Sequence, residues 1–237
     1  MRITICFVLD GMTTYKMWDI VTNIIKWITG TTPGPNTPPT MVLSPNGAKL
    51  ILEYEGLDQP SEWPGESSGI TIGRGYDLGY ETDFATDWKP FLLPDEIARL
   101  QTAVGLSGAA AEAIAPQFKD IHITEQAADQ VFYNKTVPIY IQMTEQAFPG
   151  VEALPPDAQG ALISLVYNRG DSMGTQGQPS WDSRLEMRNI RALVPKKDLQ
   201  GIADQIRDMK RLWPDDKGLQ DRREAEAQLV ESCIQKK

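Results

Sequence analysis

The sequence of 237 residues has only two cysteines and a single histidine. Cys6 and Cys233 lie at opposite ends, without neighbouring cysteines or histidines, so neither a disulfide framework nor a zinc site is indicated. A single disulfide between Cys6 and Cys233 remains an alternative. His122, in IHIT, has no obvious serine or cysteine partner, which disfavours a histidine-dependent catalytic triad. We expect no metal and no organic cofactor.

The chain also lacks an excess of basic residues and a long apolar run. Its formal net charge of −9 should repel polyanions, so nucleic acid is a disfavoured partner. The apolar run of residues 3–9 is too short to span a bilayer and lacks a convincing cleavage site, so we expect no conventional signal peptide. The composition is otherwise that of an ordinary folded protein.

Prolines divide the chain into three parts. Residues 1–30 form an N-terminal segment whose stretch YKMWDIVTNIIKWITG predicts an amphipathic helix. This helix would dock on the main domain or on a partner, although Trp18 and Trp27 also allow binding to a membrane surface. Residues 31–43, rich in proline, read as a linker. Residues 44–237 form the main domain.

The main domain is predicted to be α+β and mostly α. Ser44 and Pro45 open its first helix, which ends near Glu55. The stretch WPGESSGITIGRGYDLG predicts a small β-hairpin or three-stranded sheet, and the acidic stretch YETDFATD that follows predicts a solvated loop. From Pro94 the pattern is largely helical, with a break or kink expected at Pro138. The helix PDAQGALISLVYNRG should bury one face and end at Gly170.

The glycines of GITIGRGYDLG, residues 69–79, resemble a phosphate-binding loop only superficially. A dinucleotide site needs a buried strand before the glycines and a helix opening at them, and the sequence shows no βαβ pattern. The hairpin interpretation explains more, because Gly73 and Gly75 would leave one strand face bare for an extended glycan. Glu55 could then face Thr71 and Asp77 across a cleft, which would supply the two carboxylates of glycoside hydrolysis.

The sequence resembles phage-type lysozymes at four places in the same order. EYEGL at residues 53–57 and TIGRG at residues 71–75 resemble the helix-ending Glu-Gly and the T-x-G-x-G hairpin of that family. ALISLVYNRG at residues 161–170 resembles its buried central helix. GLQDRREAEAQLV at residues 218–230 resembles its last helix. Arg222 and Arg223 could pair there with carboxylates near the cleft, although we expect one of them to be solvated or to cover an apolar seam. The resemblance implies a lysozyme-like fold with a small sheet and a helical lobe.

The order Glu55, Thr71, Asp77 is similar to that of pesticin-type bacteriocin muramidases. Many phage enzymes place the second acidic residue a few positions before the threonine, where this sequence has Pro64 and Gly65. The resemblance therefore implies Glu55 as the acid, Thr71 as the residue that orients water, and Asp77 as the second carboxylate. Glu62 and Glu66, which flank Pro64 and Gly65, are the alternatives for that carboxylate.

The activity implied is hydrolysis of the β-1,4 bond between N-acetylmuramic acid and N-acetylglucosamine, with inversion. The partner would be the glycan strand of peptidoglycan, and the protein a monomer made in the bacterial cytoplasm that acts on the cell wall in the periplasm. A phage endolysin and an antibacterial toxin both fit this activity. A non-catalytic glycan-binding module on the same scaffold and a hydrolase of a related glycan such as chitin remain alternatives.

Overall fold

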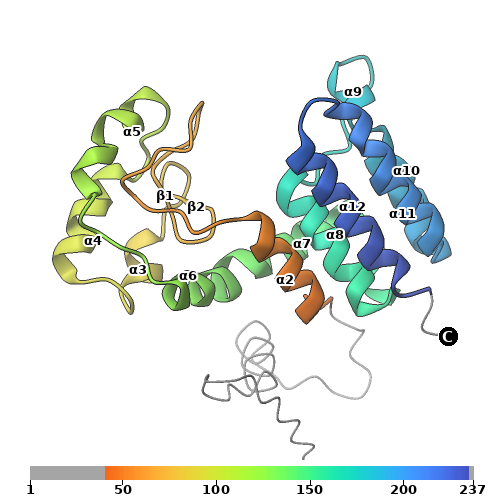
Figure 1. The fold of residues 1–237 in the computed structure, drawn as a ribbon, viewed down its shortest axis with the longest axis horizontal. Coiled ribbons are helices and arrows are strands. Elements are labelled where there is room, and N and C mark those ends of the chain that lie inside the picture. The colour runs from red at the N-terminus through yellow and green to blue at the C-terminus, as the bar shows by residue number, and fades with distance from the viewer. Residues whose placement is uncertain (1–40, 235–237) are drawn as a thin grey trace, which may run out of the picture. The chain divides into compact units, whose positions relative to one another are not determined.

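The computed structural model describes residues 41–234 (Figure 1). The predicted N-terminal helix and most of the predicted linker lie outside this part. The structure is mostly helical, 62%, with one two-stranded antiparallel sheet, which confirms the α+β, mostly α class. No helix among the described residues has both the length and the apolar character needed to cross a membrane.

The helices and strands follow in this order: α2 (Pro45–Tyr54), β1 (Thr71–Ile72), β2 (Tyr76–Asp77), α3 (Phe84–Trp88), α4 (Pro94–Leu100), α5 (Ala109–Ile114), α6 (Glu125–Val131), α7 (Val137–Ala147), α8 (Pro156–Arg169), α9 (Ser180–Ser183), α10 (Leu185–Leu193), α11 (Leu199–Asp208) and α12 (Lys217–Glu231). Short 3₁₀ turns connect several of them, and a π-helical turn joins α6 to α7.

The start of α2 follows from its capping residues. The Ser44 hydroxyl accepts a hydrogen bond from the Gly47 amide at 3.0 Å, and Pro45 occupies the first turn, where no amide donor is needed. The chain just before the helix is already packed, because Met41 is 2% exposed and the Val42 amide donates to Gln159 Oε1. The compact unit therefore begins at Met41, inside the predicted linker of residues 31–43.

The predicted hairpin is present, with two strands and one extra bridge. Thr71 pairs with Asp77, and Ile72 pairs with Tyr76. A third segment contributes only the isolated bridge between Asp58 and Gly73.

The expectation of a bare strand face is wrong. Gly73 and Gly75 lie in the turn, at φ of 66° and 70°, which is a conformation that favours glycine. A side chain at Gly73 would come within 2.7 Å of the Trp88 ring, and one at Gly75 within 2.8 Å of the Tyr167 hydroxyl. Protein side chains, not an open face, therefore fill the space that these glycines leave.

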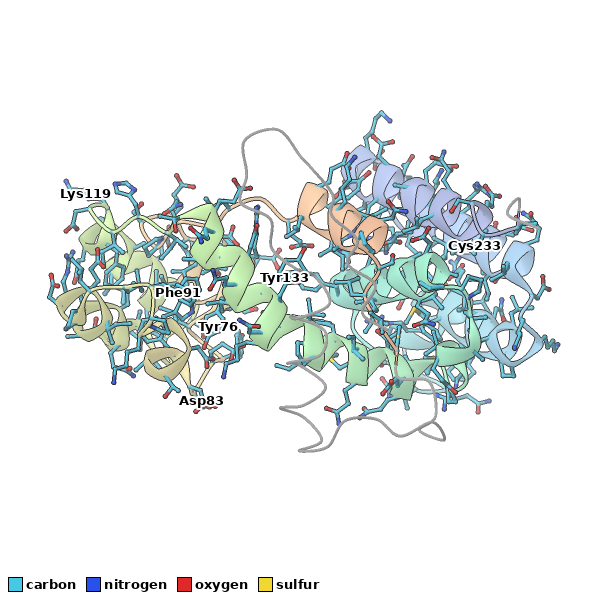
Figure 2. The ribbon with its side chains drawn as sticks, turned by 90° about the horizontal axis from the view of Figure 1, so that it is seen from below. Tyr76, Asp83, Phe91, Lys119, Tyr133 and Cys233 are labelled. Carbon is cyan, nitrogen blue, oxygen red and sulfur yellow. The ribbon has the colours of Figure 1, made fainter. Side chains whose placement is uncertain are left out.

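The predicted solvated loop YETDFATD contains a short helix, α3, and that prediction is also wrong. Phe84 and Trp88 stand four residues apart, so they project from one face of α3, and both are fully buried. Tyr76 and Phe91, both labelled in Figure 2, pack edge-on against Trp88 with ring centroids 5.6 and 6.4 Å away. We call the core around these rings the hairpin cluster, whose buried members are Ile70, Ile72, Tyr76, Leu78, Phe84, Trp88, Leu100, Ala103, Ala111, Ala115, Phe118, Ile121, Ile123, Ala127, Ala128 and Val131.

Helices α6 and α7 form one helical path from residue 125 to residue 147 (Figure 1). Pro138 does not break it, because the preceding turn, residues 132–136, is π-helical. Proline has no amide to donate, and it sits in the first turn of α7, where a wider preceding turn accommodates its ring. The expected disturbance at Pro138 therefore takes the form of a local change in helix type.

A second core surrounds α8. Every residue of α8 from 158 to 166 is buried, so the expectation of a single buried face is wrong. Helices α2, α7 and α12 pack around α8 (Figure 1), and a helix enclosed on all sides shows no amphipathic period. The backbones of α2 and α8 approach each other closely at Gly47 and Gly160, where a side chain on either glycine would meet the other's Cα within 2.8 Å.

We predict that Gly160→Ala lowers the free energy of unfolding by about 1–3 kcal/mol, because the added methyl group must push two helix backbones apart. Gly56→Ala is the matched control, because no atom lies within 4 Å of the position a methyl group would take there. Chemical denaturation of the two variants and the parent measures the difference. Equal stability of both variants would contradict the close packing of α2 on α8.

Candidate functional site

Glu55 caps the C-terminus of α2, and its carboxylate is tied to the last helix. Its amide donates to Ile51 O, and its side chain is 21% exposed. Oε1 accepts a hydrogen bond from Nη1 of Arg222 at 2.5 Å. Residues 55 and 222 are 167 positions apart, so this ion pair joins the first and last helices of the described unit.

The expectation that one of Arg222 and Arg223 is solvated is wrong, because both are buried in a network of charges. Both pair with carboxylates, which is the alternative interpretation of these arginines. Their side chains are 4% and 0% exposed, and Glu226, one turn further along α12, is fully buried between them. Glu226 Oε1 accepts from the Ser164 hydroxyl of α8 at 2.7 Å and from Arg223 Nη2 at 2.9 Å. Nε of Arg222 lies 3.4 Å from the same carboxylate oxygen.

The charges of this network balance. Two guanidinium groups face the two carboxylates of Glu55 and Glu226, so these four groups together carry no net charge. An uncompensated buried charge costs several kcal/mol, which explains why the four groups occur together. The network therefore fixes the end of α2 against α8 and α12.

The chain that follows Glu55 holds the turn of the hairpin. The Gly56 carbonyl accepts from Arg74 Nη1 at 2.8 Å. Asp58 exchanges both backbone hydrogen bonds with Gly73, and its Oδ2 accepts from the Gly75 amide at 3.0 Å. The buried Arg74 also forms ion pairs with two carboxylates of α6, those of Glu125 and Asp129. The T-x-G-x-G turn is thus fastened within three residues of Glu55.

Thr71 and Asp77 are brought together by the register of the hairpin. Residues directly opposite each other in an antiparallel pair project from the same face, so these two side chains are neighbours. Thr71 is buried, and its hydroxyl lies 3.4 Å from the Gly69 carbonyl, to which it donates. Asp77 accepts through Oδ1 from the amides of Gly69 and Gly79, at 3.0 and 2.8 Å, and through Oδ2 from the Gly69 amide at 3.1 Å.

Glu55 and the Thr71–Asp77 pair do not contact one another among the described residues. The rings of Tyr140 and Tyr167 lie against each other at a tilt of 38°, with centroids 4.4 Å apart. The Tyr167 hydroxyl donates to the Arg74 carbonyl at 3.2 Å. Burial raises the pKa of both phenols, and the negative charge of Glu55 raises it further. Glu55 therefore lies within electrostatic range of the tyrosine pair that touches the turn.

The alternative carboxylates Glu62 and Glu66 are exposed on the loop before the hairpin. Neither side chain forms a hydrogen bond or ion pair with a described residue, and Glu66 has a left-handed backbone, with φ of 51°. The structure therefore gives them no defined orientation toward Glu55.

Two further carboxylates near the hairpin were missed by the sequence analysis. Burial raises the pKa of Asp58. The hydrogen bond from the Gly75 amide lowers this pKa, and the negative charge of Glu55 raises it, with the net result that it lies above its ordinary value. Burial likewise raises the pKa of Glu81, with further contributions from Asp87 and Asp77. Asp58 stands only three residues after Glu55, and this short spacing was the available signal. Among the described residues, no three His, Cys, Asp or Glu side chains are grouped so that they could hold a metal ion.

Comparison with protein families gives one match. Residues 57–147 match the model of a family described as a domain of unknown function, DUF8812. The match starts two residues after Glu55, includes the hairpin, and ends with α7, so it covers less than half of the chain and none of the network on α12. No curated protein matches the sequence.

We predict that Glu226→Gln lowers the free energy of unfolding by about 3–5 kcal/mol, because it leaves a buried guanidinium without a counter-charge. Asp221→Asn, on the exposed side of the same helix, removes a surface pair with Lys217 and should cost less than about 0.5 kcal/mol. Thermal and denaturant unfolding of both variants tests this. A similar loss of unfolding free energy in both variants would show that the buried network stabilises the protein no more than the surface pair does.

Proposed function

We propose that this protein is an N-acetylmuramidase on a lysozyme-like scaffold, cleaving the β-1,4 bond of peptidoglycan. The observation that carries the proposal is the attachment of the hairpin directly behind a helix-ending glutamate. Glu55 ends α2, and Gly56 and Asp58 hold the turn of a hairpin whose strands pair Thr71 with Asp77. These are the residue types, in the order, that the resemblance to pesticin-type muramidases implies.

In the proposed reaction Glu55, in its protonated form, gives its proton to the leaving oxygen. A water that Thr71 orients attacks the opposite face of the sugar and passes its proton to the carboxylate of Asp77. Inversion requires the two carboxyl groups to stand roughly 6.5–9.5 Å apart, which leaves room for that water. An ionised carboxylate has about four acceptor sites, and Asp77 uses three contacts on backbone amides. Acceptor capacity for a water therefore remains on Oδ2.

The proposed setting is the bacterial cell wall, reached from the cytoplasm, with the glycan strand of peptidoglycan as the partner. The net charge of −9 disfavours adhesion to anionic envelopes by charge alone. This favours a toxin or effector delivered by another route over an endolysin that binds the wall directly. A holin gene beside this one would reverse that preference, and an immunity gene would support it.

A second candidate function is non-catalytic glycan binding on the same scaffold. It is favoured by the contacts of Asp77, whose amide hydrogen bonds are those of a residue that braces its own hairpin. Fold alone does not decide between binding and catalysis. Binding to purified sacculi without release of reducing ends would select this candidate.

We predict that Glu55→Gln lowers the rate of reducing-end release from purified sacculi by at least about 10²-fold, because general-acid assistance contributes about 10²–10⁴-fold. Glu53→Gln, an exposed glutamate on the same helix, is the control and should retain the parent rate. Unfolding curves confirm that both variants are folded. A Glu55→Gln variant that lyses sacculi at the parent rate would refute the assignment.

For the second carboxylate we predict that Asp77→Asn abolishes hydrolysis, whereas Glu62→Gln and Glu66→Gln remain active. The asparagine keeps one oxygen acceptor for the Gly69 and Gly79 amides, so the hairpin should stay folded while its charge is lost. Asp58→Asn belongs in the same series, because Asp58 lies beside Glu55 and is partly buried. An inactive Asp58, Glu62 or Glu66 variant beside an active Asp77 variant would reassign the role.

A further inference from the structure

Tyr80, just after the hairpin, is a large aromatic side chain that the fold leaves open to solvent. It is 68% exposed, more than any other large apolar side chain among the described residues. A single exposed ring is ordinary on a protein surface, so exposure alone assigns it no role. This ring is also fixed, because its hydroxyl donates a hydrogen bond to the Ser67 carbonyl at 3.0 Å. The ring is therefore held in one place while most of its surface stays uncovered.

The segment that accepts this hydrogen bond is itself held in place at the next residue. The Ser68 carbonyl accepts from Trp63 Nε1 at 2.8 Å and from the Gly108 amide at 2.9 Å. The Ser68 amide donates to the Gly65 carbonyl at 3.1 Å. Ordering an exposed side chain on binding costs free energy. Because Tyr80 is already ordered on an ordered segment, a ligand that covers its ring avoids most of this cost.

The ring lies next to the carboxylate that the proposed reaction uses. Oδ1 of Asp77 accepts from the amides of Gly69 and Gly79, at 3.0 and 2.8 Å, so this carboxylate joins the two segments on either side of the hairpin. Tyr80 joins the same two segments one position further out, and its own amide donates to the Asp77 carbonyl at 3.1 Å. Three residues of extended chain span at most about 10 Å, so Tyr80 and Asp77 are neighbours.

The side chains beside the ring suit a sugar better than another copy of this protein. Glu66 and Ser67 are both exposed, and a carboxylate and a hydroxyl accept hydrogen bonds from hydroxyl donors. A pyranose carries such donors on its edge, and its faces present C–H groups that pack on an aromatic ring. A second copy of the chain is disfavoured as the occupant, because two chains of net charge −9 repel each other.

We propose that Tyr80 is a sugar-binding platform beside Asp77, on which one pyranose ring of the glycan strand packs. This inference rests on the proposed function, which supplies the glycan. A β-1,4 glycan is an extended polymer, so sugars on either side of the cleaved bond lie along the protein surface. Binding energy from such remote sugars can be used to orient the reacting bond. The preferred substrate is therefore a strand of several sugars and not a disaccharide.

Binding of a short glycan tests the platform apart from cleavage. The probe is a peptide-free tetrasaccharide of alternating N-acetylglucosamine and N-acetylmuramic acid, and the full chain carries Glu55→Gln so that the probe stays intact. In calorimetry, adding Tyr80→Ala should raise the dissociation constant about tenfold, which corresponds to roughly 50–60 Å² of apolar ring surface left uncovered. Leu93→Ala removes another highly exposed apolar side chain, 62% exposed at the start of α4, and should leave binding unchanged.

Tyr80→Phe separates the ring from its hydroxyl. This variant keeps the ring and loses the hydrogen bond to the Ser67 carbonyl, so its dissociation constant should stay within about threefold of that of the protein with Tyr80. A loss of binding as large as that of Tyr80→Ala would assign the role to the hydrogen bond and overturn the platform. Unchanged binding after Tyr80→Ala, or no binding of the probe at all, would also overturn it.

Sedimentation of the same variants tests the competing occupant. Tyr80→Ala should leave the oligomeric state unchanged. A change in oligomeric state without a change in glycan binding would assign the ring to a protein contact and overturn the proposal. The proposed function fails separately: binding that depends on Tyr80, with no release of reducing ends from sacculi by the unaltered protein, would support the platform and refute the muramidase activity.

Discussion

The ion pair between Glu55 and Arg222 is the contact on which the arrangement of the site depends. Glu55 ends the first helix of the described unit, and Arg222 belongs to its last helix. Arg222 is in turn held by Glu226 and by the Ser164 carbonyl of the buried helix α8. The position of the glutamate is therefore set by charges in the interior, and not by the loop that follows it.

The hairpin depends on the same end of α2 through different bonds. Arg74 donates to the Gly56 carbonyl, and Asp58 holds the turn through its backbone and its carboxylate. Tyr167 connects the turn to α8 through its hydroxyl. The glutamate and the Thr71–Asp77 pair are thus linked through fixed side chains and backbone, which is the preorganisation that chemistry at two carboxylates requires.

The local features of the fold could be predicted from the sequence. Ser44 and Pro45 open α2, and Gly170 ends α8, because capping and stop signals act within a few residues. The spacing of the glycines correctly predicts the hairpin. It does not predict that Gly73 and Gly75 lie in the turn, packed against protein side chains, and leave no bare strand face. The surroundings of Gly73 include Trp88, which belongs to a helix whose acidic residues predict a solvated loop.

What depends on distant residues could not be predicted in the same way. The burial of Arg222 and Glu226 requires partners on α2 and α8, and these partners lie far away in the sequence. The hydrogen bonds from the Gly69 and Gly79 amides to Asp77 likewise form only when the hairpin closes. The sequence indicated which residues carry the proposed chemistry, and the structure adds how each is held.

The central claim is that this chain hydrolyses the glycan of peptidoglycan at muramic acid. Mass spectrometry of purified sacculi after incubation with the protein tests it most directly. The account predicts soluble fragments whose glycan ends in a reducing N-acetylmuramic acid. Fragments ending in anhydromuramic acid or in N-acetylglucosamine, or a glycan left intact, would contradict it.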